Sequence, residues 1–196
     1  MNRGACAVAD SPDHHGLMAH AAVRPATVSD VDEIVRIQTV TWQTAYADLV
    51  PAAAIERLQG PEAREAWLAA VTAGDPYHVL VATEGRWTVG FCACACYSGE
   101  GGMIAEITTL LVEPRWGRRG HGGRLLAHAA HALRGHGASE GRAWIPEADT
   151  ASRSFYAHAG WHPDGAARRL DTGEGELREI RVRGSLDLEL IDPENV

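Results

Sequence analysis

The residues best suited to do chemistry lie in one stretch, Arg115 to Gly123, where glycines and arginines are concentrated. This stretch follows an apolar run rich in strand-forming residues, Ile104 to Val112, and Pro114 then ends the strand because it lacks a backbone donor. Beyond the stretch, leucines and alanines recur with the spacing of one helix face, at positions 125, 126, 129, 130 and 133. The sequence therefore predicts a strand, a glycine loop and a helix in succession.

A loop of this kind is suited to a phosphate group. The first turn of a helix leaves backbone N–H groups free and carries the positive end of the helix dipole. Glycines let a backbone approach an anion closely, and arginines add positive charge within a chain whose net charge is −8. We expect a phosphate-bearing ligand to contact Arg118, Arg119, Gly120, His121, Gly122, Gly123 and Arg124.

Several common chemistries are excluded by the sequence. The dinucleotide pattern G-x-G-x-x-G fails because Leu125 occupies the third glycine position. The chain has no lysine, and all 18 of its basic residues are arginines, which excludes a Walker loop and Schiff-base chemistry. Neither H-E-x-x-H nor Gly-x-Ser-x-Gly occurs, so we expect no catalytic metal and no hydrolase nucleophile elbow.

The glycine loop resembles the acetyl-coenzyme A loop of the GNAT-type N-acetyltransferases. In that family a V-x-P sequence precedes a Gln or Arg, two further residues, G-x-G or G-x-A, and a helix with apolar residues in its first turn. The Gln or Arg position falls on Gly117 here, and Arg118 follows it, so the usual Arg-Gly order is inverted. The matching residues are Val112, Pro114, Gly120, Gly122, Leu125 and Leu126.

A second stretch, Asp149 to Trp161, is similar to another signature of the same family. That signature is an Asn, a small residue three positions on, Phe-Tyr and then Gly-Phe; Asp149 takes the Asn position and Trp161 the final Phe position. The two signatures have the order and spacing of the family, and the resemblance covers about residues 22–186. It implies that the cofactor also contacts Asp149, Ser152 and Phe155.

The resemblance implies transfer of an acetyl group from acetyl-coenzyme A to a primary amine by direct attack. A backbone N–H near Leu110, Leu111 or Val112 on the fourth strand would stabilise the thioester oxygen as it gains charge. The pantetheine arm would lie in the gap where the fourth and fifth strands separate. Tyr156 would protonate the departing thiolate, and the alternative is a ring that only packs on the cofactor or the core.

Glu106 is the candidate general base that takes a proton from the amine. It lies on the same strand in an apolar stretch, which would raise its pKa. In a regular strand it would share a face with Thr108, Leu110 and Val112, whereas a bulge would change this. The alternatives are a surface or ion-pair role for Glu106 and a base that acts through water.

Trp42 and Tyr46 are the candidate contacts for the acceptor amine. They are four residues apart, so they would share a helix face, and in GNAT enzymes the first two helices shape the acceptor pocket. Core packing is the alternative for Trp42. The acceptor is open among a polyamine, an aminoglycoside-like amine, an amino acid and a protein N-terminus. A non-catalytic acyl-coenzyme A binding or sensing module is the alternative to an enzyme.

The predicted fold is a single α/β (α+β) domain, GNAT-like, with a mixed, mostly antiparallel twisted sheet of about seven strands and helices on both faces. Helices are expected after Ser29 or Asp30 as the cap, from Pro51, from Pro61, after the glycine loop and after Asp149 or Thr150. Strands are expected at 22–25, 78–83, 87–97, 104–112, 142–145, 168–171 and 176–186. The domain should span 21–187, between a disordered leader, 1–20, and a C-terminal tail, 188–196.

The remaining expectations concern cysteines, histidines and partners. Cys92, Cys94 and Cys96 alternate with alanines, which predicts a buried strand face; a metal site is the alternative, although zinc sites favour C-x-x-C spacing. No disulfide framework is apparent, which favours a reducing cytoplasm. The acidic balance and the lack of a long apolar run argue against nucleic acid and membrane partners. Dimers are common in the family that the chain resembles, so a homodimer is one alternative for the oligomeric state, which the sequence leaves open. A solvated helix face is expected for His128, His131 and His136.

Overall fold

The computed structural model describes residues 21–99, 102–173 and 175–188. The predicted leader, 1–20, and the tail beyond residue 188 lie outside the described residues. The helices are α1 (Val31–Ala45), α2 (Ala52–Arg57), α3 (Pro61–Thr72), α4 (His121–Gly135) and α5 (Thr150–His158). The strands are β1 (Ala21–Pro25), β2 (Tyr77–Glu84), β3 (Trp87–Gly99), β4 (Gly102–Val112), β5 (Glu140–Pro146), β6 (His162–Asp171) and β7 (Glu176–Ser185).

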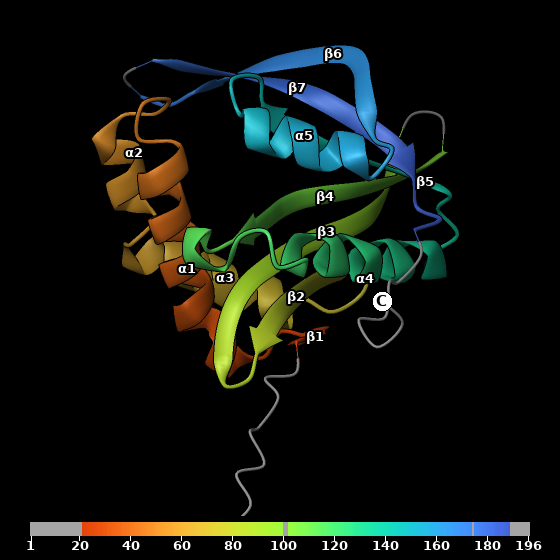
Figure 1. Cartoon of the computed structure of the whole chain (residues 1–196), viewed down its shortest axis with the longest axis horizontal. Coiled ribbons are helices and arrows are strands. Elements are labelled where there is room, and N and C mark those ends of the chain that lie inside the picture. Colours follow the sequence, from red (N-terminus) through yellow and green to blue (C-terminus); the bar gives the residue numbers. More distant parts are fainter. Residues whose placement is uncertain (1–20, 100–101, 174, 189–196) are drawn as a thin grey trace, which may run out of the picture.

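The seven strands form one sheet in the order β1-β2-β3-β4-β5-β7-β6. All described neighbours run antiparallel except β4 and β5, which are parallel and are joined by a crossover through α4 (Figure 1). The predicted fold class is therefore confirmed. The closing hairpin is longer than predicted, because β6 begins at His162. No helix within the described residues has the length and apolar content needed to cross a membrane.

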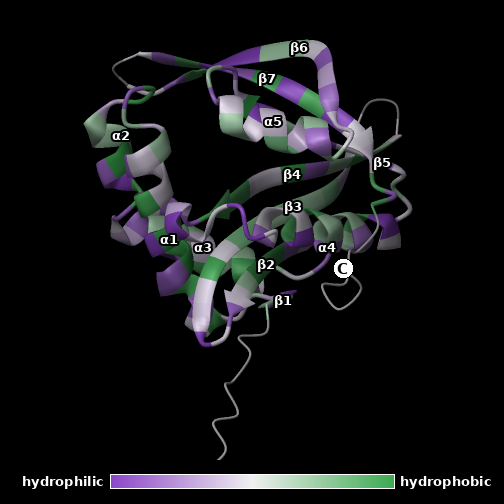
Figure 2. Ribbon diagram, viewed as in Figure 1, coloured by the Kyte–Doolittle hydropathy of each residue, from purple (hydrophilic) through white to green (hydrophobic). Residues whose placement is uncertain are grey.

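Helices cover both faces of the sheet. The buried side chains of α4 and α5 pack on one face, whereas Ile34 and Ile37 of α1 pack with Phe91 on the other, next to Trp67 of α3. Figure 2 shows hydrophobic and hydrophilic residues alternating along these helices, as expected for helices with one face toward a sheet. A smaller cluster joins the end of α1 and α2 to Leu177 of β7.

Two details of the predicted elements need correction. Asp30 is the N-cap residue of α1, as predicted, but its side chain makes no capping bond to that helix. It accepts the Thr27 backbone N–H at 2.8 Å within a capping box that begins a short 3-10 turn, Val28–Asp30. His136 does not lie on a solvated face, because it is half-buried and its Nε2 lies 3.0 Å from Nε2 of His78. Asp30 bonds a residue of the preceding turn, and His136 contacts a residue that is distant in sequence. Helical periodicity predicts neither partner.

The prediction of a buried cysteine face on β3 is confirmed. Cys92, Cys94 and Cys96 are buried, free thiols in the core beneath α4. A hydrogen bond with Cys94 and burial raise the pKa of the Cys92 thiol, so it stays protonated at neutral pH. Small side chains on this strand let α4 approach the sheet closely.

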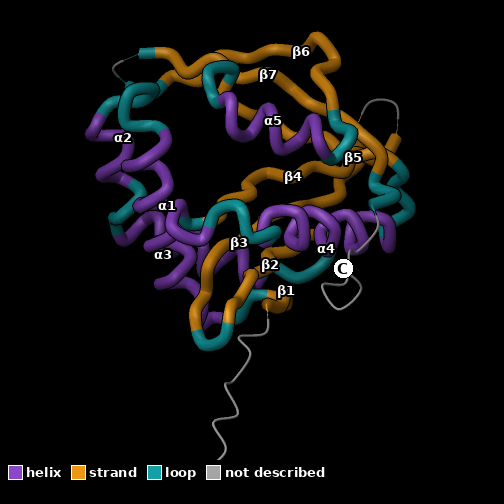
Figure 3. The backbone as a smooth tube through the Cα atoms, in the orientation of Figure 1, coloured by secondary structure: helices purple, strands orange, loops and turns teal. Residues whose placement is uncertain are grey.

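The pairing of β4 with β5 is unusually short. Only three residue pairs connect them, Ala105 with Gly141, Glu106 with Arg142 and Ile107 with Ala143. Beyond Ile107, β4 continues to Val112 with β3 as its one strand partner among the described residues, and β5 continues paired with β7 (Figure 3). The backbone groups of β4 that face away from β3 therefore have no neighbouring strand from Thr108 onward.

Trp161 fixes the junction of β5, α5 and β7. Its side chain is completely buried, and its Nε1 donates to the Ser185 carbonyl at 3.0 Å. Its ring lies against two glycines that are paired across β5 and β7, Gly141 and Gly184. A Cβ at Gly184 would lie 2.2 Å from Cδ1 of Trp161, and a Cβ at Gly141 would lie 2.6 Å from its Cη2. Glycine is required at both positions because an indole occupies the space of a side chain.

Gly184→Ala is therefore expected to lower the free energy of unfolding by about 1–3 kcal/mol, the usual cost of overpacking a core. Urea denaturation of the two proteins measures this difference. Gly135→Ala, at the end of α4, is the control, because nothing lies within 4 Å of the added Cβ. It should be neutral or stabilise by up to about 1 kcal/mol. A Gly184→Ala midpoint equal to that of the wild type would contradict this account of Trp161.

Candidate active site

The predicted glycine loop is a left-handed turn that leads directly into α4. Gly120 precedes the helix with φ +79°, and Arg118 has φ +61°, a left-handed conformation that costs energy for a residue with a side chain. The helix begins at His121, within the predicted loop. The four N–H groups from Gly120 to Gly123 donate to no residue that the structure describes, and the first helical bond here is from Arg124 N to Gly120 O at 3.1 Å. The helix start thus presents free donors.

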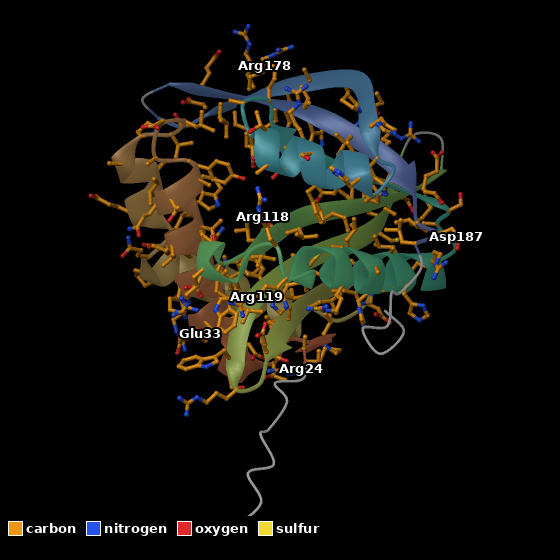
Figure 4. The ribbon with its side chains drawn as sticks, viewed as in Figure 1. Arg24, Glu33, Arg118, Arg119, Arg178 and Asp187 are labelled. Atoms are coloured by element: carbon orange, nitrogen blue, oxygen red, sulfur yellow. The ribbon has the colours of Figure 1, made fainter. Side chains whose placement is uncertain are left out.

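Two of the three arginines predicted to bind phosphate are already bound within the chain. Arg119 donates to Glu84 at 3.1 Å and lies over the Trp116 ring at 4.9 Å. Arg124 donates from one nitrogen to the Arg119 carbonyl at 3.1 Å. Arg118 is exposed and forms no ion pair or hydrogen bond with any described residue, and Figure 4 shows its side chain extending from the loop toward α5. Arg118 is therefore the arginine of this loop whose charge remains available to a ligand.

His121 anchors the loop to the sheet. Its side chain is 1% exposed, with Nε2 at 2.8 Å from Glu84 and Nδ1 at 3.1 Å from Nη2 of Arg124. Arginine can only donate, so Nδ1 accepts, and Nε2 carries the proton that is donated to Glu84. Burial lowers the pKa of His121, the Glu84 hydrogen bond opposes this, and the charge of Arg124 lowers it further. His121 is thus neutral and structural, and Glu84 was not predicted because it lies 37 residues away in sequence.

Two further donors near the loop are buried without an acceptor among the described residues. They are Nε1 of Trp116, in the 3-10 turn Pro114–Trp116, and Nε of Arg124. Buried donors are normally satisfied by protein, water or a ligand. Together with the free N–H groups of the helix start, they show that this loop has more hydrogen-bond donors than the described residues can use.

Phe155 and Gly122, both predicted to contact the cofactor, lie against each other. A Cβ at Gly122 would lie 3.1 Å from Cε2 of Phe155, so glycine allows α5 to approach the first turn of α4. Phe155 also makes an edge contact with Tyr156, with ring centroids 5.1 Å apart. The two sequence signatures therefore meet where α4 begins.

Tyr156 lies in the core beside the unpaired part of β4. Its ring stacks on Trp161 at 5.5 Å, and its core cluster includes Cys92, the β3 partner of Leu110. Its hydroxyl group makes no hydrogen bond with a described residue. Burial raises the pKa of Tyr156 well above its ordinary value, and the nearby Cys92 and Tyr46 add to this. The phenol is therefore protonated at neutral pH.

Tyr46, Asp149 and Ser152 form one hydrogen-bonded group that joins the end of α1 to the start of α5. The Tyr46 hydroxyl donates to Oδ2 of Asp149 at 2.7 Å, and Asp149 caps α5 by accepting the Ser152 N–H at 2.9 Å and its hydroxyl at 2.6 Å. Burial and the bond to Asp149 raise the pKa of Tyr46. Trp42 contacts Tyr46 edge to face at 5.2 Å, which confirms that the two share a helix side. Sequence spacing could not pair Tyr46 with Asp149.

Glu106 does not have the surroundings predicted for it. The β3–β4 register shifts so that Ala93 pairs with Thr109 and Cys94 with Ile107, which leaves Thr108 as a bulge. Because of this extra residue, Leu110 and Val112 reach the core that contains Ala105 and Ile107, and Glu106 faces the opposite side of the sheet.

The setting of Glu106 is also polar rather than apolar. Its carboxylate accepts from Arg142 Nε at 2.6 Å and from the Tyr97 hydroxyl at 2.9 Å. The expectation of apolar surroundings is wrong, whereas the bulge and the ion pair, both stated as alternatives, are observed. The role of Glu106 as a base stays a prediction.

Two cavities lie outside this region. One, of about 500 Å³, is lined by the first residues of β4 and β5 together with Arg181 and Arg183 of β7. The other, of about 290 Å³, lies between α5 and β7 near Trp161. Neither includes the glycine loop, so the candidate site is defined by the separation of β4 from β5 and by the free donors.

Comparison with known proteins agrees with this geometry. Residues 75–163 match the family model of the acetyltransferase (GNAT) domain. The N-acetyltransferase YuaI of Bacillus subtilis, itself uncharacterized, is 26% identical over 139 residues, which cover 70% of this chain and 78% of YuaI. The family model and the relative both describe N-acetyltransferases, and together they support a GNAT-type acyltransferase.

Solved structures show the same fold. The PaiA N-acetyltransferase from Thermoplasma acidophilum, in complex with coenzyme A, superimposes with a TM-score of 0.70 at 17% identity, covering 85% of this chain and 99% of that one. The GCN5-related N-acetyltransferase from Rhodopseudomonas palustris gives a TM-score of 0.66 at 22% identity, covering 87% and 99%.

The neutral state of His121 predicts a pH dependence of stability. Its folded pKa lies below the ordinary value of 6.5, so the unfolded chain binds a proton first as pH falls. The stabilisation is present above that value and is lost as pH falls through the folded pKa. His121→Gln, which can still donate to Glu84 and accept from Arg124, should lose less unfolding free energy than the wild type between neutral and mildly acidic pH.

Urea denaturation at several pH values measures this difference in slope. His131→Gln, on the exposed side of the same helix, is the matched control and should follow the wild type. Equal slopes for the wild type and His121→Gln would show that His121 is not held neutral by this network.

Proposed function

We propose that this protein transfers an acetyl group from acetyl-coenzyme A to a primary amine, and that the helix start at Gly120 to Gly123 binds the pyrophosphate. One observation carries the proposal: four free N–H groups open α4, which follows β4 in the chain, and β4 is the strand that has separated from β5. PaiA, which shares the fold, has a crystal structure in complex with coenzyme A. A binding or sensing module without catalysis is not favoured, because the relative and the family model are acetyltransferases.

The residues present fit a pantetheine-bearing nucleotide. The loop has surplus donors on Trp116 and Arg124, and Arg118 supplies an uncommitted positive charge. From Leu110 to Val112, backbone groups that face away from β3 lack a strand partner and can bond the amides of the pantetheine arm. One such N–H would stabilise the thioester oxygen as it gains negative charge. Coenzyme A would supply the activated acetyl group.

Tyr156 is the proposed acid for the departing thiolate. A general acid must hold a proton at the working pH and must not donate it elsewhere in the chain. Tyr156 meets both needs, since burial raises its pKa and its hydroxyl group makes no bond to a described residue. It lies in the core cluster that contains Cys92. Cys92 of β3 pairs with Leu110, which belongs to the part of β4 that does not pair with β5.

Glu106 is proposed as the base through an intervening water rather than by direct contact. Arg142 and Tyr97 both bind Oε2 of its carboxylate, which leaves Oε1 able to accept a hydrogen bond from that water. It faces the side of the sheet on which α1 packs, and the end of α1 carries Trp42 and Tyr46. We therefore propose that the amine arrives from the α1 side, while the thioester lies along β4.

We also propose a cytoplasmic location and a homodimer. Three buried free thiols, Cys92, Cys94 and Cys96, favour a reducing compartment. The strand β6 (His162–Asp171) is an almost wholly exposed sheet edge and favours pairing with a second copy.

Titration calorimetry with acetyl-coenzyme A tests the proposed function. The wild type should bind one molecule per chain. Arg118→Gln should raise the dissociation constant about tenfold, the order of one charge-assisted hydrogen bond, and should make binding less sensitive to salt. Arg115→Gln is the control, because Arg115 is exposed and already bonded to Glu113 at 2.6 Å. Absence of binding to the wild type would overturn the proposal, and equal affinities would remove Arg118 from the site.

Tyr156→Phe tests the proposed acid. Loss of general acid catalysis should lower kcat by roughly a hundredfold or more, while the affinity for acetyl-coenzyme A stays unchanged. The assay is free-thiol release with a polyamine, an aminoglycoside, an amino acid and a peptide with a free N-terminus, which also identifies the acceptor class. Tyr77→Phe is the matched control because Tyr77 is 54% exposed. Unaltered kinetics in Tyr156→Phe would assign the proton to another donor.

A further inference from the structure

Three side chains of types that bind metal ions lie together at the end of α4 opposite the glycine loop. Asp75 precedes β2, His78 is the second residue of β2, and His136 follows the last residue of α4. A helix of 15 residues is about 22 Å long, so this group is remote from the helix start that carries the proposed acetyl-coenzyme A site. None of the three has a part in the proposed acetyl transfer.

The ligand atoms converge on one point. Nε2 of His78 lies 3.0 Å from Nε2 of His136, and Oδ1 of Asp75 lies 3.7 Å from the first and 4.0 Å from the second. A tetrahedral ion with bonds of about 2.1 Å holds neighbouring ligand atoms about 3.4 Å apart. The three observed separations lie on both sides of that value, so small side-chain rotations bring all three atoms to bonding distance.

The two imidazoles are held by rigid parts of the fold. His78 belongs to a strand paired with Cys94 of β3, and the backbone N–H of His136 donates to the Leu133 carbonyl at 3.1 Å. Both side chains are only about one quarter exposed, whereas Asp75 is 77% exposed and can adjust. Two nitrogen ligands held in place by the fold and one exposed carboxylate form a site that needs little ordering on binding.

We propose that Asp75, His78 and His136 bind one divalent transition metal ion, for which Zn²⁺ is the probe. Two imidazoles and one carboxylate are ligands that suit Zn²⁺ and its neighbours rather than Mg²⁺, and a fourth position remains for water. The ion would connect the end of α4 to the start of β2. It would thereby stabilise the helix that presents the glycine loop, without taking part in the chemistry.

The test uses the full chain stripped of metal, with His14, His15 and His20 replaced by Gln in every protein to remove adventitious binding. Calorimetry with Zn²⁺ should give one ion per chain. The melting temperature should rise by roughly 5–10 °C at a free ion concentration about one hundred times the dissociation constant. His78→Gln and His136→Gln should each weaken binding at least tenfold, and Mg²⁺ should have no effect. His128→Gln with His131→Gln, on the same helix, is the matched control.

Asp75→Asn is the second variant, because its exposed side chain can change without disturbing the fold. It should weaken Zn²⁺ binding while the melting temperature in chelator and the affinity for acetyl-coenzyme A stay at wild-type values. Binding that persists in the double variant of His78 and His136, or a wild type that binds no Zn²⁺, would overturn the site. Loss of Zn²⁺ binding with intact acetyl-coenzyme A affinity separates this proposal from the proposed function.

Discussion

The separation of β4 from β5 is the constraint on which the rest of the structure depends. Parallel pairing that stops after three residue pairs leaves backbone donors and acceptors of β4 without partners inside an otherwise continuous sheet. Such groups must be satisfied by water or by a bound molecule. The fold keeps this gap open by placing α5 beside it and by holding α1 to α5 through the Tyr46–Asp149 hydrogen bond. An extended ligand with its own amides is the natural partner for an unpaired strand edge.

The glycine loop illustrates how a charged loop remains available to a ligand. Arg119 lies over Trp116, Arg124 bonds His121, and Arg119 and His121 occupy both oxygens of Glu84, so this carboxylate does not accept from the free N–H groups of the helix start. This internal network leaves the N–H groups of the helix start available to a ligand, in an acidic chain whose carboxylates could otherwise bind them. The inverted Gly117-Arg118 order has a structural counterpart, because Arg118 takes the left-handed conformation and its side chain extends away from the network.

The elements of the fold were predictable because each depends on local information. The leucine and alanine spacing after the loop, the cap at Asp149 and the alternating cysteines depend on neighbours within a few residues, and all three were confirmed. The partners of the site residues were not predictable. Glu84 reaches His121 across 37 positions and Tyr46 reaches Asp149 across 103, and only the closed fold brings such pairs together.

The bulge at Thr108 shows why strand periodicity does not predict which side chains of β4 share a face on either side of it. Side chains alternate with a period of two, so one extra residue reverses every later position relative to every earlier one. A bulge leaves no clear mark on composition, because threonine fits a regular strand as well as it fits the bulge. Its consequence is that one strand presents Leu110 to the core beneath α5 and Glu106 to the α1 side. One strand therefore presents an unpaired backbone edge along one part and a carboxylate on the other face, which are the two features that the proposed acetyl transfer uses.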